Sequence, residues 1–271
     1  MVIAGCGKTR AKTEMIQSIT NPFLRLLAAG AVALAFVVPG RAAEPIILNK
    51  ARAYVGSDAA LDGLKSLHYT GTIVSTDPAD PTKQTRSAME MIFQKPDQQR
   101  IMATSDKLIE VTALDGYDGW QRLQDPADPT KWRQSLLGSD QIKRLRAQAW
   151  ENLAFYRGIE RVGGRVEDQG PTSMDGVACQ KVAFIHGPGI VFIRYFDVAT
   201  GRLVFTELEG GGTVKEQGEI MAGGIRFPKS VIQTSKNAAG QIFTLTLTFE
   251  KILVNEVLSP KLFAVPGLSN R

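Results

Sequence analysis

The stretch IFTLTLTFEKILV, from Ile242 to Val254, decides the fold of this chain. Apolar residues alternate with threonines in its first part, so a strand here has one apolar face and one face that can contact water. The stretch AMEMIF, from Ala88 to Phe93, alternates in the same manner. Both stretches predict amphipathic strands of an antiparallel sheet. Their apolar positions on one face are Met89, Met91, Phe93, Phe243, Leu245, Leu247 and Phe249.

Outward from these two stretches, the chain consists mainly of predicted strands with short connections. Turn-forming clusters such as Lys95-Pro96-Asp97 and Asp115-Gly116 separate them. Connections this short exclude parallel βαβ units and predict an antiparallel meander. The further predicted strands are Ser66–Ser75, Arg86–Gln94, Gln98–Ser105, Lys107–Leu114, Gly119–Leu123, Lys131–Leu136, Gly176–His186, Ile190–Asp197, Leu203–Glu209, Val214–Ala222 and Ile225–Thr234.

Helices are expected at Ile47–Val55, at Asp58–Leu64 and, as the one long helix, from Ser139 to Arg157. The long helix has an apolar face formed by Ile142, Leu145, Ala149, Leu153 and Tyr156. Ser139 can cap its start, and Gly158 can end it. Nothing in the sequence resembles an interdomain linker. We therefore predict a single α+β domain with one strongly curved antiparallel sheet and helices on one face.

The polar side of the long helix carries the basic residues Lys143, Arg144 and Arg146. Such a cluster can mark a surface for an anionic partner. A solvated helix face is the favoured interpretation, because charged residues on one side of an amphipathic helix usually contact water.

The N-terminus has the pattern of a secretory signal peptide. Arg25 precedes an uncharged apolar run, LLAAGAVALAFVV, from Leu26 to Val38, and small residues follow it. The run is too short to favour a membrane span, which needs about 20 residues. We expect residues 1–42 to be removed by cleavage after Ala42, residues 43–271 to form the mature domain, and the protein to be periplasmic. Either Met1 or Met15 can be the true start.

Removal of this leader changes the charge and the cysteine content. The full chain has a net charge of +5, and the leader contains five basic residues and one acidic residue, so the mature chain has a charge of +1. This balance gives no electrostatic reason to expect a nucleic-acid partner. Cys6 is also removed, which leaves Cys179 alone, so no intramolecular disulfide is expected. We interpret Cys179 as a buried strand thiol.

Catalytic and metal-binding motifs are missing from the sequence. The two histidines, His68 and His186, stand apart on predicted strands, and no HExxH, GxSxG or phosphate-binding glycine loop occurs. We expect no metal, no cofactor and no enzymatic activity, although scattered Asp and Glu residues leave a secreted enzyme as a third alternative. The repeated DPADPTK segments, Asp77–Lys83 and Asp125–Lys131, have loop chemistry.

The apolar inner surface of such a sheet has to be buried by a few helices. It can form a solid core or enclose a ligand cavity. From the residues alone we favour the solid core, although methionine-rich faces such as that with Met89 and Met91 are common at adaptable apolar sites.

A family resemblance rests on an ordered set of short motifs. Lys95-Pro96 is followed by Arg100, then Asp115-Gly116, Trp120 and an Asp-Pro loop. This order resembles the LolA-like proteins, the periplasmic lipoprotein-carrier family also called outer membrane lipoprotein-sorting proteins. Later segments are similar in kind rather than letter for letter: Tyr195–Asp197 before Thr200-Gly201, Gly224–Pro228, and Val254-Asn255 before Leu262–Pro266.

The resemblance implies a half-open β-barrel that wraps over helices and encloses a hydrophobic cavity for acyl chains. It shifts the expectation from a solid core to a cavity, with Trp120 and the seven apolar positions given above as lining residues. Arg100 would position a lid or contact a polar headgroup. The implied function is that of a monomeric carrier of lipid or lipoprotein acyl chains, with inner- and outer-membrane transport components as partners and transient membrane contact.

This chain departs from the family pattern in its greater length and in its two Pro-rich loops. A different class of function therefore stays open: an envelope sensor or scaffold of the same fold that binds a protein partner through a sheet edge or the basic helix face, without lipid transport.

Overall fold

The computed structural model describes residues 45–77, 80, 82–208, 211–236 and 240–267. These residues belong to one compact unit that spans Ala42–Arg271. The predicted signal peptide, residues 1–42, lies outside the described residues, and its removal stays a prediction.

One antiparallel sheet of 13 strands dominates the structure. Consecutive strands are neighbours within β1–β6 and within β7–β13, and the ladder between β1 and β13 joins the two series. Strands β6 and β7, although consecutive in sequence, are the two edges of the sheet. The strands are β1 (Ser66–Thr76), β2 (Gln84–Gln94), β3 (Gln98–Thr104), β4 (Ile109–Asp115), β5 (Asp118–Gln124), β6 (Trp132–Leu136), β7 (Arg165–Met174), β8 (Val177–Gly187), β9 (Ile190–Asp197), β10 (Leu203–Leu208), β11 (Thr213–Ala222), β12 (Ile225–Lys236) and β13 (Ile242–Val254).

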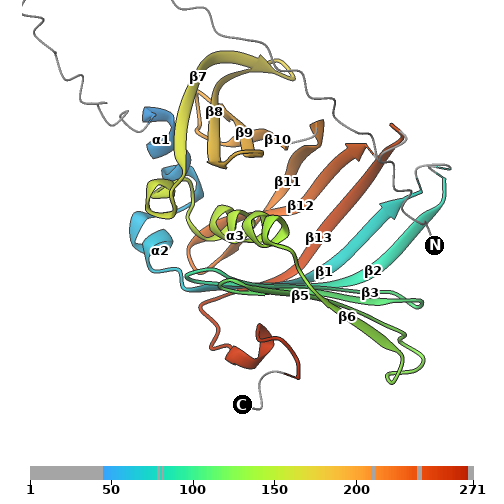
Figure 1. Ribbon diagram of the computed structural model, residues 1–271. Helices are drawn as coiled ribbons and strands as arrows, with labels where there is room; N and C mark the ends of the chain where they lie inside the picture. Colours follow the sequence, from blue (N-terminus) through green and yellow to red (C-terminus); the bar gives the residue numbers. More distant parts are fainter. Residues whose placement is uncertain (1–44, 78–79, 81, 209–210, 237–239, 268–271) are drawn as a thin grey trace, which may run out of the picture. The chain divides into compact units, whose positions relative to one another are not determined.

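The sheet curls around its helices, as Figure 1 shows. The helical elements that lie wholly within the described residues are α1 (Ile46–Val55), α2 (Asp58–Asp62), α3 (Ser139–Leu153) and two short 3₁₀ turns, η1 (Ile159–Val162) and η3 (Pro260–Leu262). Helix α3 crosses the concave face, whereas η3 lies on the convex face (Figure 1). The predicted fold class, a single α+β unit with a curved antiparallel sheet over helices, is confirmed.

Strand β7 is missing from the sequence-based prediction. Its sequence, RVEDQGPTSM, is mostly polar and exposed and contains Gly170 and Pro171. An edge strand needs hydrogen bonds on one side only, so it tolerates a proline that a central strand would exclude. The segment therefore lacks the apolar alternation by which the other strands are recognised.

Helix α3 is shorter than predicted. It ends at Leu153, and Phe155 and Tyr156 adopt left-handed backbone angles (φ 46° and 72°), so Tyr156 does not lie on the helical apolar face and Gly158 does not end the helix. Nor does Ser139 cap its start: Gly138 is the N-cap, and its backbone N–H donates to Oε1 of Gln141 at 3.0 Å.

Three clusters of buried side chains hold the sheet and helices together. The largest lies between α3, α2 and the concave face and includes Leu153, Phe93 and Phe227. A second joins α1 to the β8–β9 end of the sheet. A third lies on the convex face between β4, β5 and the C-terminal segment. Strand β9 is covered on both faces at its end, where Phe196 belongs to the second cluster and Tyr195 to a fourth, which lies within the sheet and also contains Cys179 and Phe205.

Candidate functional site

A cavity of about 250 Å³ lies between the concave face and the C-terminal part of α3. One side of it is apolar and comes from β1, β2, β12, β13 and the segment after α3. These apolar lining residues are Tyr69, Met91, Phe155, Phe227, Val231 and Phe249. Aromatic rings dominate this wall: the Tyr69 ring lies 5.0 Å from that of Phe249 and 5.8 Å from that of Phe227, centroid to centroid.

Strand alternation explains why these side chains share one face. Met91 lies opposite Tyr69 in the β1–β2 ladder, and Gly71 lies between Met89 and Phe249. Gly71 has no side chain because an added Cβ would lie 1.9 Å from the carbonyl oxygen of Thr248. A register shift between Thr70 and Gly71 keeps the apolar residues of β13 on the concave face along its whole length.

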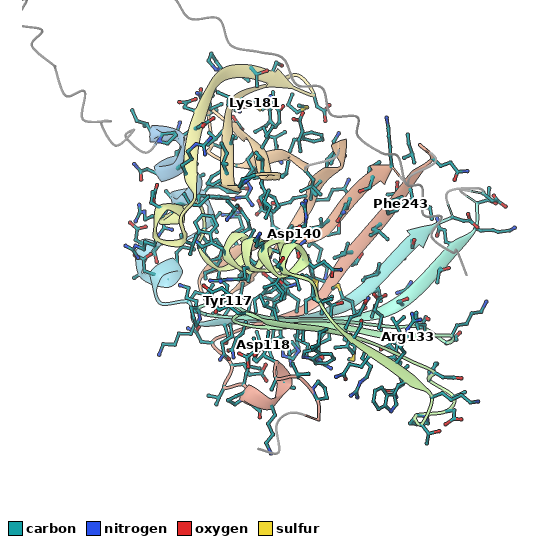
Figure 2. The ribbon with its side chains drawn as sticks, viewed as in Figure 1. Tyr117, Asp118, Arg133, Asp140, Lys181 and Phe243 are labelled. Carbon is teal, nitrogen blue, oxygen red and sulfur yellow. The ribbon has the colours of Figure 1, made fainter. Side chains whose placement is uncertain are left out.

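The apolar wall continues beyond the cavity as a half-exposed stripe. Ile73 of β1, Leu247 of β13 and Val231 of β12 are direct neighbours in consecutive ladders, and all three side chains are partly exposed. Leu245 and Phe243 extend the stripe along β13 toward the end of the strand that lies far from α3, where Figure 2 labels Phe243. A row of apolar side chains is therefore left incompletely covered.

The predicted lining residues of β2 and β13 all lie on this concave face, at different depths. Met89 and Phe93 are buried in the main core, at 3% and 1% exposure. Met91 and Phe249 line the cavity itself. Leu247 packs beside the core and is half-buried, as are Leu245 and Phe243 farther along the strand.

Trp120 and Arg100 lie on the opposite, convex face, so neither side chain lines the cavity. Nε1 of Trp120 donates to the carbonyl oxygen of Phe263 at 2.9 Å, which fastens the C-terminal segment to the sheet. Arg100 forms an ion pair with Glu90, which also contacts His68. Successive side chains of a strand point to opposite faces of the sheet. Trp120 and Arg100 therefore project to the face opposite to that of the residues next to them in sequence.

The other side of the cavity is charged. Glu151 of α3 contacts Nη1 of Arg194 in β9 at 2.5 Å and Nε2 of His186 in β8 at 2.6 Å. The side chains of all three residues are at most 10% exposed. The guanidinium of Arg194 also lies 5.0 Å from the ring centroids of Tyr156 and Phe184. These contacts tie the helix to the distal half of the sheet.

A second carboxylate, Glu216 of β11, lines the same cavity. Removal from bulk water raises its pKa to about 7, although the positive charges of Arg194 and Arg202 act in the opposite direction. The cavity therefore contains an apolar wall and a titratable group that changes charge near neutral pH.

The sequence gives only a weak signal for these charged residues. Arg194 interrupts an otherwise apolar strand, and a cation in such a position needs a buried partner. The partner, Glu151, is 43 residues away on a helix, and no local pattern joins the two. Only the folded chain brings them together.

The described part of the chain contains no group of three or more His, Cys, Asp or Glu side chains placed to hold a metal ion. None of its helices has both the length and the apolar character needed to cross a bilayer. Cys179 is fully buried on β8, as expected, and burial raises the pKa of its thiol.

Comparison of the sequence with known proteins gives no match to a family model or to a curated protein. Solved structures, in contrast, resemble this one. An outer membrane lipoprotein-sorting protein domain from Vibrio parahaemolyticus is 12% identical, with a TM-score of 0.51 over 80% of this chain and 95% of that one. A LolA superfamily protein from Nitrosomonas europaea is also 12% identical, with a TM-score of 0.50 over 81% and 96%. A DUF1329 family protein from Desulfovibrio piger is 10% identical, with a TM-score of 0.52 over 80% and 95%. The chain has a LolA-like fold.

Proposed function

We propose that this chain, with its LolA-like fold, is a periplasmic carrier that binds the acyl chains of a lipid or lipoprotein. A general role in binding lipid or protein fits this fold, and so does a place in the cell envelope. The proposal includes export, with residues 1–42 removed as a signal peptide. The transport components of the inner and outer membrane are the proposed partners.

The observation that carries the proposal is the continuity between the cavity and the half-exposed stripe. Met91, Phe249 and Val231 line the cavity, and Leu247 and Ile73 continue the apolar surface toward the open end of the sheet. An acyl chain laid along this path would cover side chains that the protein leaves partly exposed to water. We propose Met91, Phe243, Leu245, Leu247 and Phe249 as its contacts, with Met89 and Phe93 as the packed base.

The energy of such binding is sufficient. Each methylene group removed from water contributes about 0.8 kcal/mol, so about ten groups contribute roughly 8 kcal/mol before the cost of ordering the chain. A pocket with few polar contacts to the acyl chain selects for apolarity rather than for a particular sequence or shape.

The first test is to purify the protein from a Gram-negative periplasm, record native mass spectra and extract bound lipid. We expect a co-purifying acyl species in near-stoichiometric amount. An empty protein that also fails to bind a fluorescent fatty acid would contradict the proposal and favour a filled core.

A matched pair of variants on β13 locates the site. Leu245→Asp places a charge on the concave stripe, whereas Thr246→Asp places the same charge on the convex face of the same strand. We expect the first variant to lose fatty-acid binding and the second to retain it, with both proteins secreted. Equal binding by both variants would show that the stripe does not contact the ligand.

A second candidate function, a scaffold that binds a protein partner, is favoured by the edge strand β6. Its side chains Trp132 and Leu136 are 53% and 67% exposed, and an unpaired strand edge can accept an added strand. The basic face of helix α3 is a weaker candidate surface for a partner, because Lys143 already pairs with Asp140 and Arg146 with Asp97. Charge reversal at Lys143, Arg144 and Arg146 would abolish binding of a partner that uses the basic helix face, spare binding of a partner on the β6 edge, and spare lipid uptake under the carrier function.

A further inference from the structure

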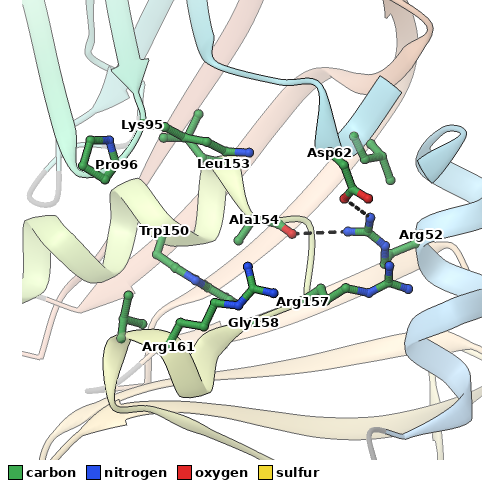
Figure 3. A pocket seen from close by; sticks show the side chains of 12 residues that line it. Arg52, Asp62, Lys95, Pro96, Trp150, Leu153, Ala154, Arg157, Gly158 and Arg161 are labelled. Carbon is green, nitrogen blue, oxygen red and sulfur yellow. Dashed lines mark hydrogen bonds and ion pairs between the residues drawn. The ribbon is translucent and has the colours of Figure 1, made fainter. Parts of the chain in front are cut away.

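A second and larger pocket, of about 550 Å³, lies on the other side of the α3 C-terminus from the acyl cavity. Figure 3 shows it between α1, α2, the β2–β3 turn, α3 and η1. Its volume is typical of sites for small organic molecules. It shares no lining residue with the acyl cavity.

Four basic side chains line this pocket: Arg52, Lys95, Arg157 and Arg161. The acidic lining residue is Asp62, and Asp58 lies just behind it. Positive charges placed around one pocket repel one another, so the arrangement favours an anion between them.

Arg52 forms the fixed wall of the pocket. Its side chain is 3% exposed, and its Nη2 contacts Asp62 at 2.8 Å and Asp58 at 3.0 Å. Its Nη1 donates to the carbonyl oxygen of Phe155 at 3.0 Å. The carboxylates next to the pocket are thus used to hold Arg52 in place.

The remaining cations are available to a ligand. Arg157 makes only a long contact to Asp58, at 3.5 Å, and one to the side chain of Asn49, at 3.3 Å. Within the part of the chain that the structure describes, Lys95 and Arg161 have no hydrogen bond or ion pair through their side chains. Burial lowers the pKa of Lys95, and the charge of Arg52 lowers it further while Asp62 opposes this change, as expected for an ammonium group beside another cation.

The pocket also has an apolar floor. Its apolar lining residues include Leu61, Leu153, Pro96 and Trp150. A small inorganic anion would leave this floor uncovered. Guanidinium and ammonium groups that approach from several sides suit a phosphate group, whose oxygens accept several charge-assisted hydrogen bonds at once.

We propose that this pocket binds a phosphate ester, with the phosphate held by Lys95, Arg157 and Arg161 and the organic part packed on Trp150 and Leu153. The ester can be the headgroup of a phospholipid or a soluble phosphate compound. The site is separate from the acyl cavity, so its existence does not depend on the carrier function.

Calorimetric titration of the purified protein tests the proposal. The probes are dihexanoylphosphatidylglycerol below its micelle concentration, glycerol 3-phosphate, and hexanoate as a phosphate-free control. We expect saturable binding of the phosphate compounds that weakens with added salt, and none of hexanoate at this site. Binding of the lipid alone identifies a headgroup, and binding of both compounds identifies a general phosphate-ester site.

Two double variants with the same change in charge provide the control. Lys95→Glu with Arg161→Glu removes the free cations of the pocket, whereas Lys107→Glu with Lys251→Glu reverses two exposed lysines elsewhere. We expect the first pair to weaken phosphate binding by at least about tenfold and the second pair to leave it unchanged. Equal weakening by both pairs, or no saturable binding by the wild-type protein, would overturn the proposal. Fatty-acid uptake, measured in parallel, should be the same in both double variants, so failure of this site is distinguishable from failure of the carrier cavity.

Discussion

The carboxylate of Glu151 on α3 and the guanidinium of Arg194 on β9 form an ion pair of 2.5 Å, with side chains only 5% and 10% exposed. Helix α3 packs mainly on β2 to β5, and the pair joins it across the cavity to β9 on the other half of the sheet. The helix is therefore held over the concave face by apolar packing on β2 to β5, and on the other side by this ion pair together with the packing of Trp150 on Phe184 and His186.

Replacement of Glu151 by Gln should lower the free energy of unfolding by about 3–5 kcal/mol, because it leaves Arg194 charged and buried without its partner. Urea unfolding monitored by circular dichroism measures the change. Asp140→Asn, at an 87% exposed position of the same helix, should have little effect. A Glu151→Gln protein as stable as the wild type would show that the ion pair does not hold the helix.

The raised pKa of Glu216 predicts a pH dependence of stability. Between its ordinary pKa of 4.5 and its folded value of about 7, the folded protein retains a proton that the unfolded chain has released. This group therefore lowers the free energy of unfolding as the pH rises through that window. In Glu216→Gln this contribution is absent, so the variant should lose less stability than the wild type between about pH 5 and about pH 8, by about 2 kcal/mol or less.

Thermal unfolding at several pH values checks this prediction. Glu250→Gln, at an exposed position of β13, is the control and should follow the wild-type pH profile. Parallel profiles of Glu216→Gln and the wild type would contradict a raised pKa.

Substitution of the buried side chain of Gln99 should stabilise the fold. This side chain is 0% exposed on the concave face, and neither its amide nitrogen nor its amide oxygen has a hydrogen-bond partner among the described residues. Because an unpaired buried amide costs free energy, Gln99→Met should raise the free energy of unfolding by about 1–2 kcal/mol. The neighbouring Gln98→Met should lower it instead, since Gln98 bonds to Gln94 and Asp115. A Gln99→Met protein less stable than the wild type would indicate an unseen partner for the amide.

Substitution of Trp120 should change the stability of the protein without changing its ligand binding. Trp120→Phe removes the hydrogen bond to Phe263 on the convex face and should lower the free energy of unfolding by about 1–3 kcal/mol. Fatty-acid binding should not change, because the indole lies on the other face of the sheet from Met91 and Phe249. Reduced binding with unchanged stability would place Trp120 in the ligand path after all.

The accuracy of the sequence-based prediction varies with local pattern. The alternation of apolar and threonine side chains predicts the strand Ile242–Val254 with the bounds that the structure shows. The polar edge strand β7 gave no such pattern. The predicted end of α3 is wrong because Tyr156 continues the apolar spacing of the helix, whereas its backbone, like that of Phe155, leaves the helical conformation.

Placement of the site residues depended on information that a short motif does not contain. Alternation correctly puts Met91 and Phe249 on the apolar face of their strands, and ladder register then brings them into one cavity. For Trp120 and Arg100 the motif indicated importance but not the face of the sheet. The Glu151–Arg194 pair joins distant segments, so only the tertiary structure shows it.

The ladder between β1 and β13 has a consequence for how the chain folds. Every other ladder joins strands that follow one another, so β1–β6 and β7–β13 are two series of hairpins whose contacts are local in sequence. Closing β1 onto β13 brings Leu67 next to Val254 and orders the long segment between them, which is the most entropically costly contact of the sheet. We expect each series to gain protection from hydrogen exchange early in refolding and the β1–β13 amides to gain it last. The cavity between α3 and the concave face, whose walls come from both series, can then form only in that final step.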